Sequence, residues 1–234
     1  MARMRKMDSA NDPKHFKKST VKGKARKPKV FFLIVCEGEK TEPNYFKNFK
    51  REFEDVILEI ECEGRGYNTQ RVVEEAIRIK NKNPNKYDRV WTVFDKDCFP
   101  AKDFNSAIQT AKLNNIGCAW SNEAFELWYL LHFQYRHTSM SREDYKKAIE
   151  KEINKTWKKS KSFRYAKNSA EIYDVLQKYG NQKQAIKRAE KLSKQRGNCK
   201  RFATHNPRTQ VHELVKQLTG QDKKLMQEIK QFFK

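Results

Sequence analysis

Hydrophobic residues gather in four short segments in the first half of the chain. Residues 30–35 form a continuous apolar run, which is typical of a strand buried on both faces. Residues 56–62 alternate between apolar and polar positions, and residues 90–94 and 116–120 are two further short apolar runs. The pattern predicts a strand in each of the four segments.

Segments with helical periodicity lie between these strands. The spacing of apolar residues predicts helices over 41–53, 69–80 and 103–113. Strands that alternate with helices build parallel sheets through right-handed crossovers. The sequence therefore predicts an α/β fold with a parallel sheet of about four strands flanked by helices.

Beyond residue 121 the pattern predicts helices joined by polar loops. The helical segments are 122–133, 142–153, 169–179, 182–195 and 209 to the end. Asn122 and Thr209 have the residue type expected at a helix N-cap. We therefore divide the chain into an N-terminal segment (1–29), an α/β core (30–121) and a helical C-terminal part (122–234) packed on that core.

Residues 1–29 are strongly basic. They carry eleven Lys and Arg residues against two acidic residues and show no hydrophobic period, which predicts a disordered basic arm. The arm contributes +9 of a formal net charge of +22, so the rest of the chain is also basic. A polyanion is the expected partner, and nucleic acid is the first candidate.

Composition and motifs argue against several other classes of protein. No apolar run approaches the roughly 20 residues of a membrane span, and the basic start lacks the apolar stretch of a secretory signal. We therefore expect a cytoplasmic protein without a membrane partner. The five scattered cysteines form no Cys-x-x-Cys pair, which disfavours a disulfide scaffold and a structural zinc site. A complete P-loop and a Gly-x-Ser-x-Gly elbow are both missing from the sequence.

Acidic residues directly follow two of the predicted strands. Glu37 follows the first strand, and Asp95 and Asp97 follow the third. The carboxyl ends of parallel strands lie at one edge of a sheet, so these side chains should meet if their strands are neighbours. Carboxylates in this arrangement can hold Mg²⁺ or Mn²⁺, which can activate a water beside a phosphate. The alternative is that they are loop acids paired with some of the many lysines.

Three sequence blocks resemble the RloB-like family. They are CEG-x2-TE-x2-YF at residues 36–46, SN-x2-FELW-x2-LHF at residues 121–133 and NPRT-x-VH at residues 206–212. The first block, together with Phe94-Asp95-Lys96-Asp97, also looks like the Toprim fold of topoisomerases, primases and OLD-type nucleases. The resemblance to the RloB-like family runs from about residue 30 to residue 218.

The resemblance implies a Toprim, Rossmann-like core and a metal-dependent nuclease that hydrolyses phosphodiester bonds in RNA, such as tRNA, or in DNA. It further implies a role in bacterial anti-phage defence (abortive infection) and a partner ATPase of the ABC or AAA type. Glu37, Asp95 and Asp97 would be the catalytic residues and the ligands of Mg²⁺ or Mn²⁺. The alternative function is a non-catalytic nucleic-acid-binding or adaptor subunit that works with the ATPase.

Four further polar residues are candidates for the same site. Glu126 lies in a strongly apolar helix, where a charge needs a partner or a function, so we expect either a further catalytic acid or a structural ion pair. Glu42 either supports the metal site or stabilises the positive end of a helix dipole. His132 either contacts phosphate or is a core histidine. Asn122 supports the site or simply caps its helix.

Two strongly basic segments lie in the helical part. Residues 151–167 carry seven Lys and Arg residues and one acid, and residues 183–201 carry eight and one. Trp157, Phe163 and Tyr165 are interleaved in the first segment, where they either stack on unpaired bases or anchor the loop to the core. The expected nucleic-acid contacts are Lys158, Lys159, Lys161, Arg164, Lys187 and Arg188.

Overall fold

The sheet is built on β1 (Val30–Cys36), the strand predicted from the continuous apolar run. The computed structural model describes residues 30–52, 56–62, 69–197 and 199–232, so the predicted basic arm over residues 1–29 lies outside the described residues. Strands β2 (Val56–Cys62) and β3 (Arg89–Val93) pair with β1 from either side, both parallel to it. Strand β4 (Gly117–Cys118) pairs in parallel with β3, which gives the order β2-β1-β3-β4.

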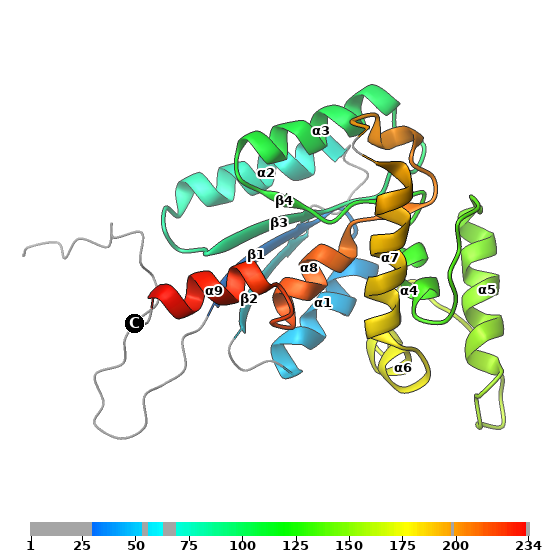
Figure 1. The fold of residues 1–234 in the computed structure, drawn as a ribbon. Helices are drawn as coiled ribbons and strands as arrows, with labels where there is room; N and C mark the ends of the chain where they lie inside the picture. The colour runs from blue at the N-terminus through cyan, green and yellow to red at the C-terminus, as the bar shows by residue number, and fades with distance from the viewer. Residues whose placement is uncertain (1–29, 53–55, 63–68, 198, 233–234) are drawn as a thin grey trace, which may run out of the picture.

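Three parallel strands of five to seven residues thus coincide with predicted strands, whereas the segment predicted over residues 116–120 contributes a strand of only two residues. The side chains of β1 alternate between two hydrophobic cores. Leu33 and Val35 belong to a core that includes buried residues of α2 (Thr69–Lys82) and α3 (Ala101–Leu113). Phe32 and Ile34 belong to the other core, together with α1 (Thr41–Glu52) and the helices of the second half. In Figure 1, α2 and α3 lie on one side of the sheet and α1 and α8 lie on the other.

The second half of the chain is mainly helical, as predicted. Its helices are α4 (Glu126–Leu131), α5 (Arg142–Asn154), α6 (Ile172–Tyr179), α7 (Gln182–Arg196), α8 (Val211–Leu218) and α9 (Lys223–Phe232), with a 3₁₀ turn at Phe202–Thr204. Buried residues of α4 to α9 share one core with β1 and β3. Among the described helices, none combines the length and the apolar character needed to cross a membrane.

A second, very small sheet corrects the prediction that residues beyond 121 form helices only. Strand β5 (Ser121–Asn122) pairs antiparallel with β6 (Arg208–Thr209), and the two hydroxyl groups of Ser121 and Thr209 are 2.9 Å apart. Two-residue strands are too short to show a hydrophobic period, so the pattern could not reveal them.

The predicted caps Asn122 and Thr209 are therefore strand residues. Helix α4 begins at Glu126, and the Nδ2 of Asn122 donates instead to the carbonyl oxygen of Ala203, at 2.9 Å. The capping position of α8 is Gln210, although the Thr209 hydroxyl accepts a hydrogen bond from the N–H of Val211 at 3.2 Å.

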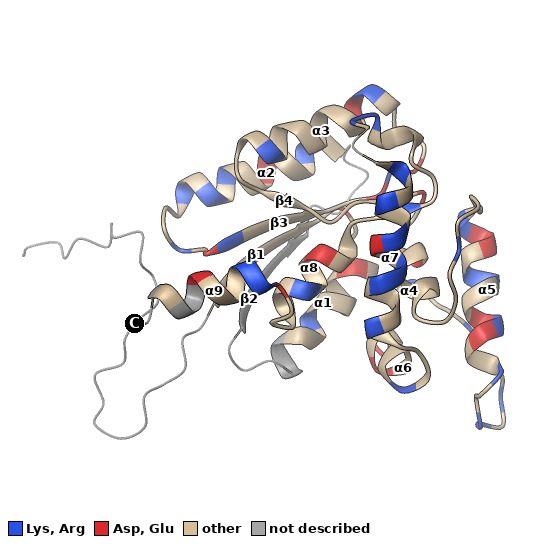
Figure 2. Ribbon diagram, viewed as in Figure 1, with Lys and Arg blue, Asp and Glu red and all other residues tan. Residues whose placement is uncertain are grey.

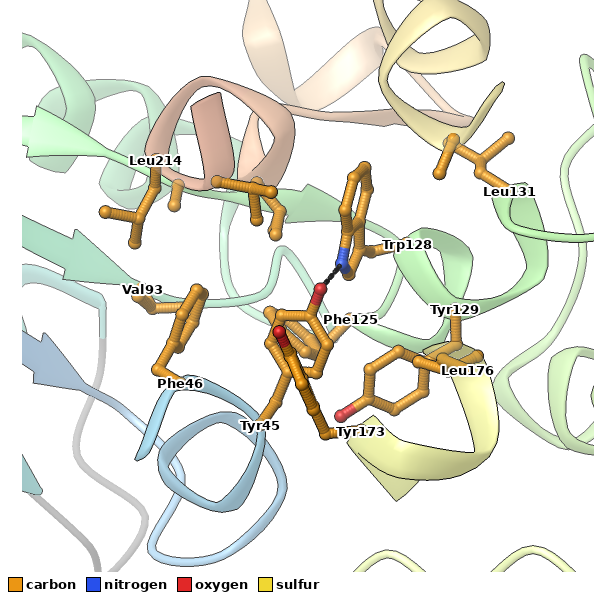
Figure 3. Packing of buried hydrophobic residues seen from close by; sticks show 14 of the residues in the cluster. Tyr45, Phe46, Val93, Phe125, Trp128, Tyr129, Leu131, Tyr173, Leu176 and Leu214 are labelled. Carbon is orange, nitrogen blue, oxygen red and sulfur yellow. Dashed lines mark hydrogen bonds between the residues drawn. The ribbon is translucent and has the colours of Figure 1, made fainter. Parts of the chain in front are cut away.

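Helix α4 is apolar because it lies inside an aromatic cluster. The ring of Tyr45, from α1, is 5.9 Å from that of Phe125 and 5.5 Å from that of Tyr129 (Figure 3). The indole N–H of Trp128 donates to the Tyr45 hydroxyl at 2.8 Å, and both side chains are fully buried. This hydrogen bond fixes the short helix α4 against α1.

Replacing Tyr45 by Phe removes the acceptor and leaves the Trp128 N–H buried without its partner. We expect Tyr45→Phe to lower the free energy of unfolding by about 1–3 kcal/mol, measured by urea denaturation. Tyr135→Phe, which removes a more exposed hydroxyl that donates to Gln195, is the matched control. Equal effects of the two substitutions would contradict the importance assigned to the buried bond.

Candidate functional site

The predicted acidic residues meet in a cavity of about 470 Å³ at the carboxyl ends of β1 and β3. Six of its twelve lining residues are acidic: Glu37, Glu39, Glu42, Asp95, Asp97 and Glu126. Three are basic: Lys40, Arg142 and Lys167. In a chain with a net charge of +22, this is a pocket with an excess of negative charge.

The sheet itself positions Glu37 and Asp95. The N–H of Glu37 donates to the carbonyl oxygen of Val93 at 2.9 Å, which continues the ladder between β1 and β3. The N–H of Asp95 donates to Glu37 Oε2 at 3.1 Å. Asp95 also forms a parallel bridge to Ser121, so β5 holds it from the other side. The backbones of the two residues are therefore held side by side, and the Glu37 carboxylate is held against the N–H of Asp95.

Asp97 lies in the turn that leaves β3. Its N–H donates to the carbonyl oxygen of Glu123 at 3.3 Å, and its φ of +38° is in the left-handed region, which Asp tolerates better than most residues. Its side chain is 41% exposed, against 13% for that of Asp95. One guanidinium nitrogen of Arg142, Nη2, lies 3.2 Å from Asp95 and 3.4 Å from Asp97.

Glu42 and Glu126 complete the cavity from the first turns of α1 and α4. Both are buried, with exposures of 6% and 2%. The Tyr165 hydroxyl donates to Glu126 Oε1 at 3.1 Å. A Cβ at position 38 would overlap the carboxylate of Glu42 as it lies here, so a larger residue would require this side chain to shift.

The loop that follows α5 closes one side of the cavity. Its backbone is tied to α1: the Thr41 hydroxyl donates to the carbonyl oxygen of Lys167 at 2.9 Å, and Asn44 Nδ2 donates to that of Asn168 at 3.2 Å. Together with the bond from Tyr165 to Glu126, these contacts place Lys167 at the cavity wall.

Burial, with repulsion from acidic neighbours, raises the pKa values of Glu37, Glu42 and Asp95. Burial, with the charges of Glu42 and Asp97 adding to it, raises the pKa of Glu37 to about 7. Burial, followed by the charge of Glu126, also raises the pKa of Glu42 to about 7. Burial raises the pKa of Asp95 well above its ordinary value, with contributions from Glu42 and Glu126. Burial and the neighbouring acidic groups thus outweigh the positive charge of Arg142 at Glu37 and Asp95.

A divalent cation fits the chemistry of this site. The donors are carboxylate oxygens, which Mg²⁺ and Mn²⁺ prefer, and Asp95 Oδ1 is buried without a hydrogen-bond partner. Within the described residues, however, no three His, Cys, Asp or Glu side chains are already spaced to hold a metal ion. Coordination by Glu37, Asp95 and Asp97 would require their side chains to draw together, with Arg142 now between the two aspartates.

Two of the supporting candidates are not brought to the cavity. His132 is buried at the far end of α4, where its Nδ1 lies 3.0 Å from the carbonyl oxygen of Trp128, and burial lowers its pKa to about 4. This environment is that of a core histidine. Asn122 is buried in β5 and does not line the cavity.

The predicted nucleic-acid contacts lie in the loop after α5 and on α7 (Figure 2). Lys158, Lys159, Lys161, Arg164 and Lys187 are exposed. Arg188 is half-buried, and its Nη1 donates to the carbonyl oxygen of Leu131 at 2.7 Å. One nitrogen of its guanidinium therefore already holds α7 to the end of α4.

The interleaved aromatic residues anchor the loop. The ring of Trp157 lies 5.2 Å from that of Phe163 and 5.1 Å from that of Tyr179, and its N–H donates to the carbonyl oxygen of Lys161. Tyr165 bonds to Glu126. Because these rings pack against the chain itself, the structure favours the anchoring alternative over stacking on bases.

Arg142 and Lys167 are the cavity residues that the sequence did not single out. Arg142 is the first residue of α5 and Lys167 is one of many lysines in a basic loop. Neither belongs to a recognisable motif, so only the folded chain reveals their proximity to the acidic residues.

The raised pKa values predict how the stability of the metal-free protein depends on pH. Between about pH 4.5 and pH 7 the folded chain keeps protons on Glu37 and Glu42 that the unfolded chain releases, so stability falls as pH rises through this range. Glu42→Gln removes one of these groups. We expect it to stabilise the protein by about 1–3 kcal/mol at pH 8 and to change it little at pH 5, in urea denaturation with EDTA.

Glu39→Gln is the matched control, because Glu39 is an exposed residue at the same cavity. It should shift stability by no more than about 0.5 kcal/mol at either pH. A loss of stability in Glu42→Gln at pH 8 would show that the ionised carboxylate is favourable where it lies.

Comparison with known proteins agrees with the sequence blocks. A family model described as RloB-like protein matches residues 32–218, which is most of the chain. No curated protein and no solved structure matches the chain. Since the family model spans the sheet, the acidic cavity and helices α4 to α8, the chain belongs to the RloB-like family.

Proposed function

We propose that this protein is a Toprim-type nuclease that hydrolyses phosphodiester bonds with Mg²⁺ or Mn²⁺. The supporting observation is the convergence of Glu37, Asp95 and Asp97 at one edge of a parallel sheet, within a cavity where six acidic residues face only three basic ones. Carboxylates gathered at such a cost in repulsion indicate that a cation belongs among them.

The basic surface supports nucleic acid as the substrate class. Exposed lysines of the loop after α5 lie in the same segment as Lys167, which lines the cavity. A polyanion held by these lysines would bring its phosphates to the acidic cavity, provided that cations neutralise the carboxylates. RNA, including tRNA, and DNA are both compatible with this arrangement.

The protein side chains have separate parts in the proposed reaction. Asp95 and Asp97 would hold the ion, with Glu126 and Glu42 as buried neighbours. Glu37, whose carboxylate accepts from the N–H of Asp95 at the same cavity, is placed to take a proton from the attacking water. The bound ion would offset phosphate charge and acidify that water. The water oxygen would bond to phosphorus as its proton passes to Glu37, the bond to the leaving oxygen would break, and that oxygen would take a proton from the protonated Glu37 or from solvent.

The biological setting is part of the proposal and is suggested by the resemblance to the RloB-like family. As an RloB-like protein, the chain would act in bacterial phage defence together with a partner ATPase. The second candidate function is a non-catalytic nucleic-acid-binding subunit of the same assembly. It is favoured by Arg142, which already provides Asp95 and Asp97 with a cation.

Cleavage assays on labelled tRNA, single-stranded DNA and duplex DNA with Mg²⁺ or Mn²⁺ separate the two functions. We expect Glu37→Gln and Asp95→Asn each to lower the cleavage rate about 10²–10⁴-fold, because each removes a group that moves a proton or holds the ion. Glu74→Gln, on the exposed side of α2, is the control and should cleave like the native chain.

Calorimetry with Mn²⁺ tests the metal site even if the isolated chain is inactive without its partner ATPase. Native protein should bind Mn²⁺ more tightly than Asp97→Asn even if neither cuts. Binding of nucleic acid by every variant, without cleavage and without Mn²⁺ uptake by the native chain, would support the non-catalytic subunit.

The loop lysines should contribute to binding mainly through phosphate charge. Lys158 and Lys159 are exposed, and Lys159 lies 4.9 Å above the ring of Trp157. Replacing both by Gln should reduce the slope of log affinity against log salt by about 1–2, measured by fluorescence anisotropy with single-stranded RNA. The control pair, Lys82→Gln with Lys112→Gln, is exposed on α2 and α3. An equal change in the control would place the contact surface elsewhere.

A further inference from the structure

The ion pair between Arg142 and the two aspartates is incomplete on the arginine side. A well-formed arginine–carboxylate pair has two parallel hydrogen bonds of about 2.7–2.9 Å. Here a single nitrogen, Nη2, serves both Asp95 and Asp97 at 3.2 and 3.4 Å. The Nε–H of Arg142 is buried and has no hydrogen-bond partner in the described part of the chain. The Nε–H of the guanidinium therefore remains available as a hydrogen-bond donor.

The carboxylate side is incomplete as well. Asp95 Oδ2 accepts from Arg142, whereas Oδ1 of the same carboxylate is buried and accepts no hydrogen bond from the described residues. Asp95 and Arg142 both line the cavity, and each member of this ion pair keeps one buried polar atom without a hydrogen-bond partner among the described residues. Buried polar groups of this kind cost free energy unless another component supplies their partners.

A phosphate with its divalent counter-ion supplies both partners. Phosphate oxygens accept from a guanidinium in the planar, two-bond arrangement that Arg142 does not make with either aspartate. The counter-ion takes the free oxygen of Asp95. A monovalent cation could satisfy only the Asp95 side. A water molecule could partner either group, but it does not offer the two parallel acceptors that match the planar guanidinium.

The anchoring of Arg142 suits such an exchange of partners. It is the first residue of α5, whose N-cap Ser141 accepts from the N–H of Asp144 at 3.1 Å, so the backbone at this point is fixed. Its side chain is 27% exposed, which leaves it accessible from the cavity. The guanidinium can therefore turn while its helix stays in place.

We propose that Arg142 is the phosphate-binding residue of the cavity: it neutralises Asp95 and Asp97 in the metal-free chain and transfers to a substrate phosphate when a divalent cation takes over the carboxylates. This inference rests on the proposed function and adds a specific residue to it. It makes phosphate binding through Arg142 dependent on the metal, because without the ion the guanidinium stays engaged with the aspartates.

The test measures binding rather than cleavage. The probe is a thymidine dinucleotide with a phosphorothioate linkage, titrated by calorimetry into the full chain with saturating Mn²⁺ and, separately, with EDTA. We expect Arg142→Gln to weaken dinucleotide binding about tenfold or more in Mn²⁺ and to leave it unchanged in EDTA. Arg142→Lys keeps the positive charge without the planar guanidinium. In Mn²⁺, its affinity for the dinucleotide should lie between those of the native chain and Arg142→Gln.

Lys146→Gln is the matched control, one turn further along α5, where the ammonium pairs with Glu143 at 3.0 Å and does not line the cavity. It should bind like the native chain. Mn²⁺ affinity of Arg142→Gln should equal or exceed that of the native protein, because a competing cation has gone.

Two results overturn the inference while the proposed function stands. In the first, Arg142→Gln binds the dinucleotide like the native chain in Mn²⁺. In the second, it loses Mn²⁺ binding as well, which would make Arg142 an organiser of the carboxylates. A third result can be distinguished from these two. If the native chain takes up no Mn²⁺, the proposed function and this inference are both contradicted.

Discussion

Repulsion among buried carboxylates is the constraint on which the organisation of this site depends. Six acidic residues line one cavity, and two of the side chains, Glu42 and Glu126, are almost wholly buried. Burial of such groups, with their repulsion adding to it, favours the protonated forms, and the raised pKa values of Glu37 and Glu42 record this response. They stay together because each is attached to an element that the rest of the fold holds in place.

The fold resists this repulsion with contacts that have nothing to do with charge. The ladder between β1 and β3 and the bridge to Ser121 fix Glu37 and Asp95 through the backbone. The aromatic cluster around Tyr45 and Trp128 fixes α1 against α4, and hence Glu42 relative to Glu126. A well-packed core can hold an unfavourable electrostatic arrangement, because its apolar contacts outweigh the repulsion. The apolar core therefore provides the stability of the fold, and the cavity provides the acidic groups for the chemistry.

The blocks shared with the RloB-like family acquire a structural meaning from this arrangement. The second block begins with β5 and the third contains β6, and these two strands pair with each other. Strand β5 also bridges to Asp95, so a segment near the end of the chain supports the carboxyl end of β3. The blocks are distant in sequence but form one support beneath the acidic cavity.

The sequence by itself indicated the strands of a parallel sheet, the helices between them and the acidic residues at the strand ends, because alternation and strand polarity are local properties. Only the fold decided that β1 and β3 are neighbours, which brings Glu37 to Asp95 and Asp97. The sequence left the fates of Glu126 and His132 open, and the fold decided them: the first faces the cavity and the second the core. It gave no sign of Arg142 among the aspartates or of the pairing of β5 with β6. Those features join residues about 45 to 90 positions apart through packing alone, and a local pattern carries no information about which distant side chain will fill a given space.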